Sequence, residues 1–247
     1  DLYDASFHDL WRKGYFLREV DKKILLKSDY LRKEAELYID YISSGEILEK
    51  NNFMCRSLRE INEGSLFMNN WVHTQTKELI EKGKLVALLG GDHSTPFGYI
   101  KALAEKHESF GVLQIDAHCD LRKSYEGFKY SHASIMYNAL PIQQLTKLVS
   151  VGIRDFCEQE NDVFLKHKDR VRIVRSADVR RQQYEGITWR EQCDAIIASL
   201  PQKVHISFDI DGLDPPLCPN TGTPVPGGFQ YEEATYLLSR LVERRTV

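Results

Sequence analysis

The feature that most constrains the fold is a repeating pattern that begins near Lys84. From there, short apolar runs of about five residues alternate with amphipathic stretches that are long enough to form helices. A continuous apolar run is typical of a strand that is buried on both faces, and a helix between successive strands makes the crossover that parallel strands need. The pattern therefore predicts an α/β fold, a three-layer αβα arrangement around a doubly wound, mostly parallel sheet.

The expected elements follow directly from this pattern. We expect strands at residues 85–89, 111–115, 148–152, 171–174 and 204–208. We expect helices near residues 95–107, 132–140, 158–168, 190–199 and 230–244. Residues 16–83 carry Leu and Tyr at helical spacing and predict a helical front part. No linker rich in Gly, Ser or Pro divides the sequence, so we expect one domain over residues 1–247, with a helical part at 1–83 and a sheet-bearing part at 84–247.

Composition narrows the class of protein. The 247 residues are 42% hydrophobic, which is enough to bury a full core, and the net charge of −3 provides no positive field for nucleic acid or anionic lipid. No apolar run approaches a membrane span, and the first residues, with Asp1, Asp4 and Asp9, do not resemble a signal peptide, so we expect a cytoplasmic protein. The five cysteines include no Cys-x-x-Cys pair and are expected to be reduced thiols.

Three of the expected strands end in acidic or imidazole side chains. The run at 85–89 leads to His93, the run at 111–115 leads to the segment 116–120, and the run at 204–208 leads to the segment 209–211. The carboxyl ends of parallel strands share one edge of a sheet, and ligands bind in the crevice outside that edge. Residues two apart on an extended chain point to the same face, so each segment should present its acidic and imidazole side chains together.

These side chains form a candidate metal centre. The candidate ligands are His93, Asp116, His118, Asp120, Asp209 and Asp211. Four carboxylates and two imidazoles cannot lie close together without compensating charge, and two divalent cations supply it. Hard oxygen ligands with two nitrogens and no thiolate favour two Mn²⁺ ions, with other divalent metals as alternatives. One Asp-x-Asp alone is more typical of a turn or a helix cap, but three coincident clusters are not.

The motifs themselves then resemble a known family. The segments that carry the resemblance are Gly90-Gly91-Asp92-His93-Ser94, Asp116-Ala117-His118-Cys119-Asp120 and Ser207-Phe208-Asp209-Ile210-Asp211-Gly212-Leu213-Asp214-Pro215. They resemble, in order and spacing, the three signatures of the ureohydrolase (arginase and agmatinase) family, and residues 221–228 resemble the loop that follows the third signature. The resemblance covers residues 84–240, and residues 125–133 are more similar to agmatinases than to arginases.

The resemblance implies an arginase-like fold and a binuclear manganese hydrolase. Such an enzyme would cleave the guanidino group of agmatine, or of a related guanidino compound, to urea and an amine through a hydroxide that bridges the two ions. It also implies a ligand set for each ion: His93, Asp116, Asp120 and Asp209 for one, and Asp116, His118, Asp209 and Asp211 for the other. Asp120 would also orient the hydroxide, and His132 would relay a proton to the leaving amine. The family resemblance further implies a homo-oligomer, a trimer or a hexamer.

The chain also departs from the family pattern. No strand with a Gly-x-Arg-x-Gly-Pro type segment precedes Leu85, and no glutamate on a later strand is available to clamp the guanidinium. Glu232, Glu233 and Glu243 lie in an expected helix and are poor substitutes, so we expect the sequence to be incomplete at its C-terminus. Cys157 stands where arginases carry an acidic residue, which argues against arginine as substrate. A two-metal phosphoesterase and a catalytically impaired, metal-binding relative without the clamping glutamate remain alternatives.

Overall fold

A computed structural model describes residue 8, residue 12 and residues 14–247. Asp1, Asp4 and Asp9, on which the expectation of no signal peptide was based, lie outside the described residues. The chain divides into two compact units, with the boundary between Ser57 and Leu58. The organisation as a single domain stays a prediction.

The first unit is helical, as the spacing of its apolar residues predicts. Helix α1 spans Lys22–Ser43 and begins after Asp21, whose side chain accepts a hydrogen bond from the backbone N–H of Lys23. A short 3₁₀ helix, Leu48–Lys50, leads to α2, which spans Asn52–Glu81 and continues into the second unit. Ser57 at the start of α2 donates a 2.8 Å hydrogen bond to Glu34 of α1, which ties the two helices together.

The second unit contains a four-stranded parallel sheet in the order β3-β2-β1-β4. The strands are β1 (Phe110–Ile115), β2 (Leu145–Ile153), β3 (Val171–Arg175) and β4 (Val204–Phe208). All three strand pairings are parallel. Every residue of β1 is buried, as expected of a central strand that is covered on both faces.

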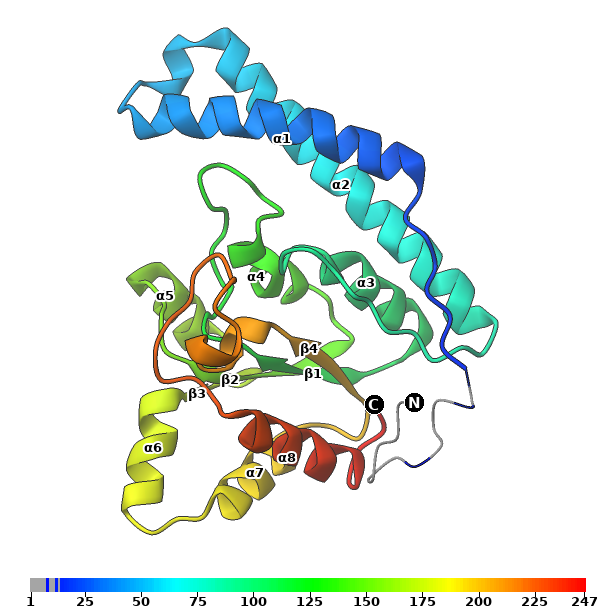
Figure 1. Ribbon diagram of the computed structural model, residues 1–247, viewed down its shortest axis with the longest axis vertical. Coiled ribbons are helices and arrows are strands. Elements are labelled where there is room, and N and C mark those ends of the chain that lie inside the picture. Colours follow the sequence, from blue (N-terminus) through cyan, green and yellow to red (C-terminus); the bar gives the residue numbers. More distant parts are fainter. Residues whose placement is uncertain (1–7, 9–11, 13) are drawn as a thin grey trace. The chain divides into compact units, whose positions relative to one another are not determined.

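Helices cover both faces of this sheet (Figure 1). On one side lie α3 (Pro96–Lys106), α4 (Ile135–Ala139) and α5 (Glu158–Lys166). On the other side lie α6 (Ser176–Tyr184), α7 (Trp189–Ala198) and α8 (Tyr231–Val242). The buried apolar residues accordingly form two clusters, one centred on Val112 and one on Leu113 of β1, whose side chains point to opposite faces. The three-layer αβα architecture with a parallel sheet is confirmed.

The strand expected at residues 85–89 is a wrong prediction. This segment has no strand structure, and Leu85 and Leu89 are 92% and 89% exposed. Together with β4 it lines a groove of about 630 Å³, and its backbone has no ladder partner in the described part of the chain. The carbonyl of Val86 accepts a 2.8 Å hydrogen bond from the Tyr99 hydroxyl of α3.

Three smaller findings complete the fold. The helix α6 was not expected, because its sequence is polar and it buries only Ser176 and Val179. All five cysteines are free thiols, as expected. Within the described residues, no helix combines the length and the apolar character that crossing a membrane requires.

Candidate metal centre

A cavity of about 600 Å³ lies at the carboxyl ends of β1 and β4. It brings together all seven side chains that the sequence singled out: His93, Asp116, His118, Asp120, His132, Asp209 and Asp211. They come from three segments that are far apart in the sequence. Their meeting follows from the parallel sheet, which directs the ends of β1 and β4 to the same edge.

The end of β1 positions Asp116, His118 and Asp120. The backbone N–H of Asp116 bonds to the carbonyl of Val151 at 3.1 Å, which continues the β1–β2 ladder up to the site. Gly152 has a φ of +95°, and a Cβ atom there would lie 2.9 Å from the Asp116 carbonyl oxygen, so only glycine fits. Asp120 has a φ of +54°, a left-handed conformation that Asp tolerates better than most residues, and its Oδ2 lies 2.8 Å from His93 Nδ1.

The end of β4 positions Asp209 and Asp211. The backbone N–H of Asp209 donates to Ile115 of β1 at 2.8 Å, and a 3₁₀ turn, Ile210–Gly212, follows. One oxygen of Asp209 accepts from the N–H of Asp211 at 3.1 Å, and one oxygen of Asp211 accepts from the N–H of Ala117 at 3.1 Å. Each carboxylate therefore has one oxygen held by a backbone N–H and a second oxygen that is available to the site.

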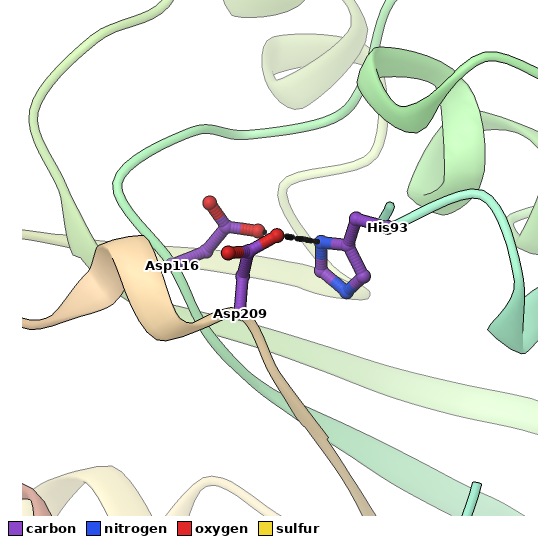
Figure 2. Close-up of side chains that lie close together, drawn as sticks. All are labelled: His93, Asp116 and Asp209. Atoms are coloured by element: carbon purple, nitrogen blue, oxygen red, sulfur yellow. Dashed lines mark ion pairs between the residues drawn. The ribbon is translucent and has the colours of Figure 1, made fainter. Parts of the chain in front are cut away.

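His93 reaches the site from the loop that precedes α3. Its Nε2 lies 2.8 Å from the hydroxyl of Ser207 on β4, which fixes the orientation of the ring. Its Nδ1 lies 2.8 Å from Asp116 Oδ2, 2.8 Å from Asp120 Oδ2 and 3.4 Å from Asp209 Oδ2. Figure 2 shows Asp116 and Asp209 facing the imidazole ring. His93, Asp116 and Asp209 thus form a first group whose ligand atoms could hold a metal ion.

Asp116, His118 and Asp211 form a second such group. His118 Nδ1 lies 3.2 Å from Asp211 Oδ2 and 3.5 Å from Asp116 Oδ1. The ligand atoms of each group lie within 4.8 Å of one another. Because Asp116 belongs to both groups through its two oxygens, the geometry is that of two adjacent cation sites that share one carboxylate.

The protonation equilibria show how strongly these groups interact. Burial raises the pKa of Asp120 to about 8, with a further contribution from the charge of Asp116. Burial opposes charge on His93 as well, but the facing carboxylates of Asp116 and Asp120 outweigh it and raise its pKa well above the usual value. In the same way Asp116 and Asp211 overcome burial and raise the pKa of His118 to about 10. Without cations, protons must therefore balance part of the negative charge.

The residues present fit a pair of divalent cations. His93 Nδ1 and Asp120 Oδ2 are buried and have no hydrogen-bond partner, although they lie only 2.8 Å apart. Buried polar atoms are rarely left unpartnered, and donor atoms that converge on one point without bonding to each other are typical of ligands around a cation. The set is rich in oxygen and contains no thiolate, which matches hard divalent metals.

His132 lies in the wall of the same cavity, at the start of a 3₁₀ helix, His132–Ser134, that leads into α4. It is exposed, and the Ser131 hydroxyl before it caps the helix by accepting from the N–H of Ala133. The ring of Tyr125 meets the imidazole edge-on at a centroid distance of 5.8 Å. The imidazole is therefore accessible to a molecule bound in the cavity.

Two features of the site were missed by the sequence analysis. Residues 220–223 line the cavity, and the buried hydroxyl of Thr221 has no partner. Arg154 ties the third motif in place, because its Nη2 donates to the carbonyls of Asp211 at 2.6 Å and Leu213 at 3.1 Å, and its Nε to that of Val225 at 2.9 Å. An arginine that binds only backbone carbonyls leaves no charge pattern in the sequence.

Comparison with known proteins places this site in context. The family model described as "Arginase family" matches residues 29–247. An N(1)-aminopropylagmatine ureohydrolase of Thermus thermophilus is 36% identical over 168 residues, which cover 68% of this chain and 54% of that protein. The enzyme of that name from Synechocystis is 28% identical over 246 residues, 96% of this chain and 74% of the relative. Against the Thermus relative, the chain spans about half of the relative's length.

Solved structures agree with this match. The agmatine ureohydrolase of Thermoplasma volcanium has a TM-score of 0.63 and 28% identity, with coverage of 74% of this chain and 58% of that one. The arginase of Bacillus cereus has a TM-score of 0.64 and 26% identity, with coverage of 76% and 68%. With a family match over more than half of its residues and the same fold in these structures, this chain belongs to the arginase family.

Proposed function

We propose that this protein is a binuclear metal hydrolase that cleaves the guanidino group of agmatine, or of a related guanidino compound, to urea and an amine. The observation that carries the proposal is the pair of ligand groups that share Asp116 inside a cavity also lined by His132. Two adjacent cations with a proton-transfer group beside them are suited to the hydrolysis of a poor electrophile. Membership of the arginase family supports the same reaction.

The ligand assignment is the one that the family resemblance implies, and it adds Asp120 to the first group and Asp209 to the second. Asp120 is supported by the 2.8 Å distance between its Oδ2 and His93 Nδ1. His93, Asp116, Asp120 and Asp209 would hold one ion, and Asp116, His118, Asp209 and Asp211 the other. Asp116 is supported as a bridging ligand because its two oxygens face His93 and His118 separately. Asp209 is supported for the first ion by its 3.4 Å distance to His93 Nδ1. The assignment of Asp209 as a ligand of the second ion rests on its position two residues before Asp211. Mn²⁺ is the metal that we propose, because the ligands are mostly carboxylates.

When bound, two divalent cations would lower the pKa of a water and so supply a strong nucleophile at neutral pH. The protein's residues would do the rest. Asp120 would orient this water toward the guanidinium carbon. Formation of the C–O bond then requires the C–N bond to the amine to break, and His132 would deliver the proton that the leaving nitrogen needs. The products are urea and a free amine.

The choice of agmatine is supported by sequence similarity. The relatives with the names N(1)-aminopropylagmatine ureohydrolase and agmatinase are 36% and 32% identical over about two thirds of this chain. Proteins named arginase and guanidinobutyrase are also similar, at 26% and 27% identity, so arginine and guanidinobutyrate are the substrates to compare. Cys157 caps α5 where an acidic residue would be needed to contact the α-amino group of arginine.

The alternative of a catalytically impaired relative depends on whether a glutamate is available to clamp the guanidinium of the substrate. Glu232 and Glu233 lie in the first turn of α8, and Glu233 forms a 2.8 Å ion pair with Arg180. Glu243 caps the other end of α8 and pairs with Arg240. None of the three lines the site cavity formed by the described residues. None of the three is therefore placed to clamp a guanidinium, and in the impaired-relative alternative metal binding would persist without turnover.

A urea-release assay separates these functions. The purified protein is loaded with Mn²⁺ and given agmatine, arginine, guanidinobutyrate or p-nitrophenyl phosphate in parallel. We expect urea from agmatine, and none after removal of the metal. Release of phosphate without urea would favour the phosphoesterase. Two tightly bound ions with no turnover of any substrate would favour the impaired relative.

A further inference from the structure

A buried polar row crosses the sheet just below the metal centre. Gln114 of β1 lies in register with Ser150 of β2 on one side and with Ser207 of β4 on the other. All three side chains are buried, and Gln114 and Ser150 are completely so. The neighbours of Gln114 along the strand, Leu113 and Ile115, are core residues. An amide in this setting costs free energy unless every donor and acceptor finds a partner.

The amide of Gln114 is fully bonded, and its partners fix which end faces the site. The Ser150 hydroxyl donates to Gln114 Oε1 at 2.6 Å. The Gln114 Nε2 group donates to Asp116 Oδ2 at 2.8 Å and to the carbonyl of His118 at 3.2 Å. The ionised carboxylate of Asp116 and the carbonyl of His118 can only accept hydrogen bonds, so they select the orientation in which Nε2 faces the site, and the Ser150 hydroxyl completes the bonding at Oε1.

Asp116 is consequently held by one neutral donor on each oxygen. Oδ2 accepts from Gln114, and Oδ1 accepts from the backbone N–H of His118 at 2.7 Å. The same two oxygens face His93 Nδ1 at 2.8 Å and His118 Nδ1 at 3.5 Å, which are the candidate ligands of the two ions. A neutral donor fixes the carboxylate without neutralising its charge, which an arginine or lysine at this position would do. Each oxygen keeps a lone pair directed at one cation site.

We propose that Gln114, whose amide oxygen is held by Ser150, is a positioning residue that holds the Asp116 carboxylate in the geometry that binds two cations at once. This inference rests on the metal-binding part of the proposed function and adds residues from inside the sheet that contact neither ion nor substrate. The polar row has the same role on its other side, where Ser207 contacts Nε2 of His93 at 2.8 Å. Groups that orient metal ligands in this way typically change metal affinity 10-fold to 100-fold when they are removed.

The test measures Mn²⁺ binding by calorimetric titration, together with the urea-induced unfolding of the metal-free protein. Gln114→Met keeps the length of the side chain and removes its donors. Gln192→Met is the matched control, because Gln192 is also buried, with its Nε2 donating to the carbonyls of Val179 and Ile187 away from the site. We expect Gln114→Met to weaken both binding steps by about 10-fold to 100-fold. Gln192→Met should lower stability to a similar extent and leave Mn²⁺ affinity unchanged.

Ser150→Ala provides a second, milder variant. Without the hydroxyl, Gln114 Oε1 loses its partner and the amide is held less firmly, so we expect a smaller loss of Mn²⁺ affinity than in Gln114→Met. In the double variant, Ser150→Ala should add no further loss, because the serine acts only through the glutamine. Wild-type affinity in Gln114→Met, or losses that simply add, would overturn the inference while the proposed function stands. A wild-type protein that binds no Mn²⁺ would overturn both.

Discussion

The proposed role of His132 in proton transfer rests on its position in the cavity. This residue lines the cavity, it is exposed, and it belongs to neither ligand group. A proton donor that lies outside the ligand set should affect the rate without affecting the metal. We therefore expect His132→Ala to keep its full metal content and to lower kcat by about 10²-fold to 10⁴-fold. Metal analysis and urea release measure the two effects separately, and His167→Ala, at the end of α5, is the control. Unchanged turnover in His132→Ala would remove its proposed role.

His205 gives the protein a specific response to acid. Burial, together with the charge of His93, lowers the pKa of His205 to about 4, its ring stacks on Tyr99, and its Nε2 has no partner. The unfolded state, with an ordinary pKa near 6.5, binds the proton more readily than the folded state, so this group destabilises the fold as the pH falls from about 6.5 to 4. The effect has the opposite sign to that of His118, whose raised pKa favours the folded state at lower pH.

The variant His205→Phe isolates this effect, because it keeps an aromatic ring against Tyr99 and cannot titrate. We expect wild type to lose about 1 to 3 kcal/mol more than His205→Phe between pH 7 and pH 4. Urea unfolding of the metal-free proteins at several pH values measures the difference. Parallel pH profiles for the two proteins would show that His205 is protonated equally well in the folded state.

At the scale of elements, apolar runs predicted β1, β2, β3 and β4 because all four belong to a sheet that helices cover on both faces, with β1 fully buried and the edge strands β3 and β4 partly so. The same signal failed at residues 85–89, since an apolar run reports a preference for burial and not the presence of a ladder partner. It also missed α6, which is polar and packs through two buried residues. The ligands could be predicted because they follow strand ends, whereas Gln114 lies inside a strand and was read as part of an apolar run.

The segment at 85–89 leads to a direct prediction about backbone protection. Its amides lack ladder bonds, so we expect them to exchange with solvent deuterium close to the rate of an unstructured peptide. Amides of β1, at residues 111–115, should be protected by several orders of magnitude, because β1 is paired on both sides. Mass spectrometry of peptic peptides can compare the two segments. Equal protection would mean that 85–89 is paired in solution.

At the scale of the whole molecule, the metal centre should contribute to stability. Its ligands come from the loop before α3 and from the ends of β1 and β4, so ions bound there link separate parts of the second unit. A ligand that binds only the folded state stabilises it by about 2.7 kcal/mol at a concentration of 100 times its Kd. We expect chelation to lower Tm by several degrees, and Mn²⁺, added back, to restore it. A Tm that does not respond to chelator would place any bound metal outside these elements.

The assembly of the whole protein stays a prediction. The family resemblance leads us to propose a homo-oligomer, a trimer or a hexamer, and light scattering on the purified protein distinguishes these from a monomer.

The central claim is that three distant segments of the chain converge to hold two cations around Asp116. Anomalous diffraction from crystals grown with Mn²⁺ tests it most directly. The account predicts two peaks about 3.5–4 Å apart, one beside His93 and one beside His118, with Asp116 between them. A single peak, or peaks that lie away from these side chains, would contradict it.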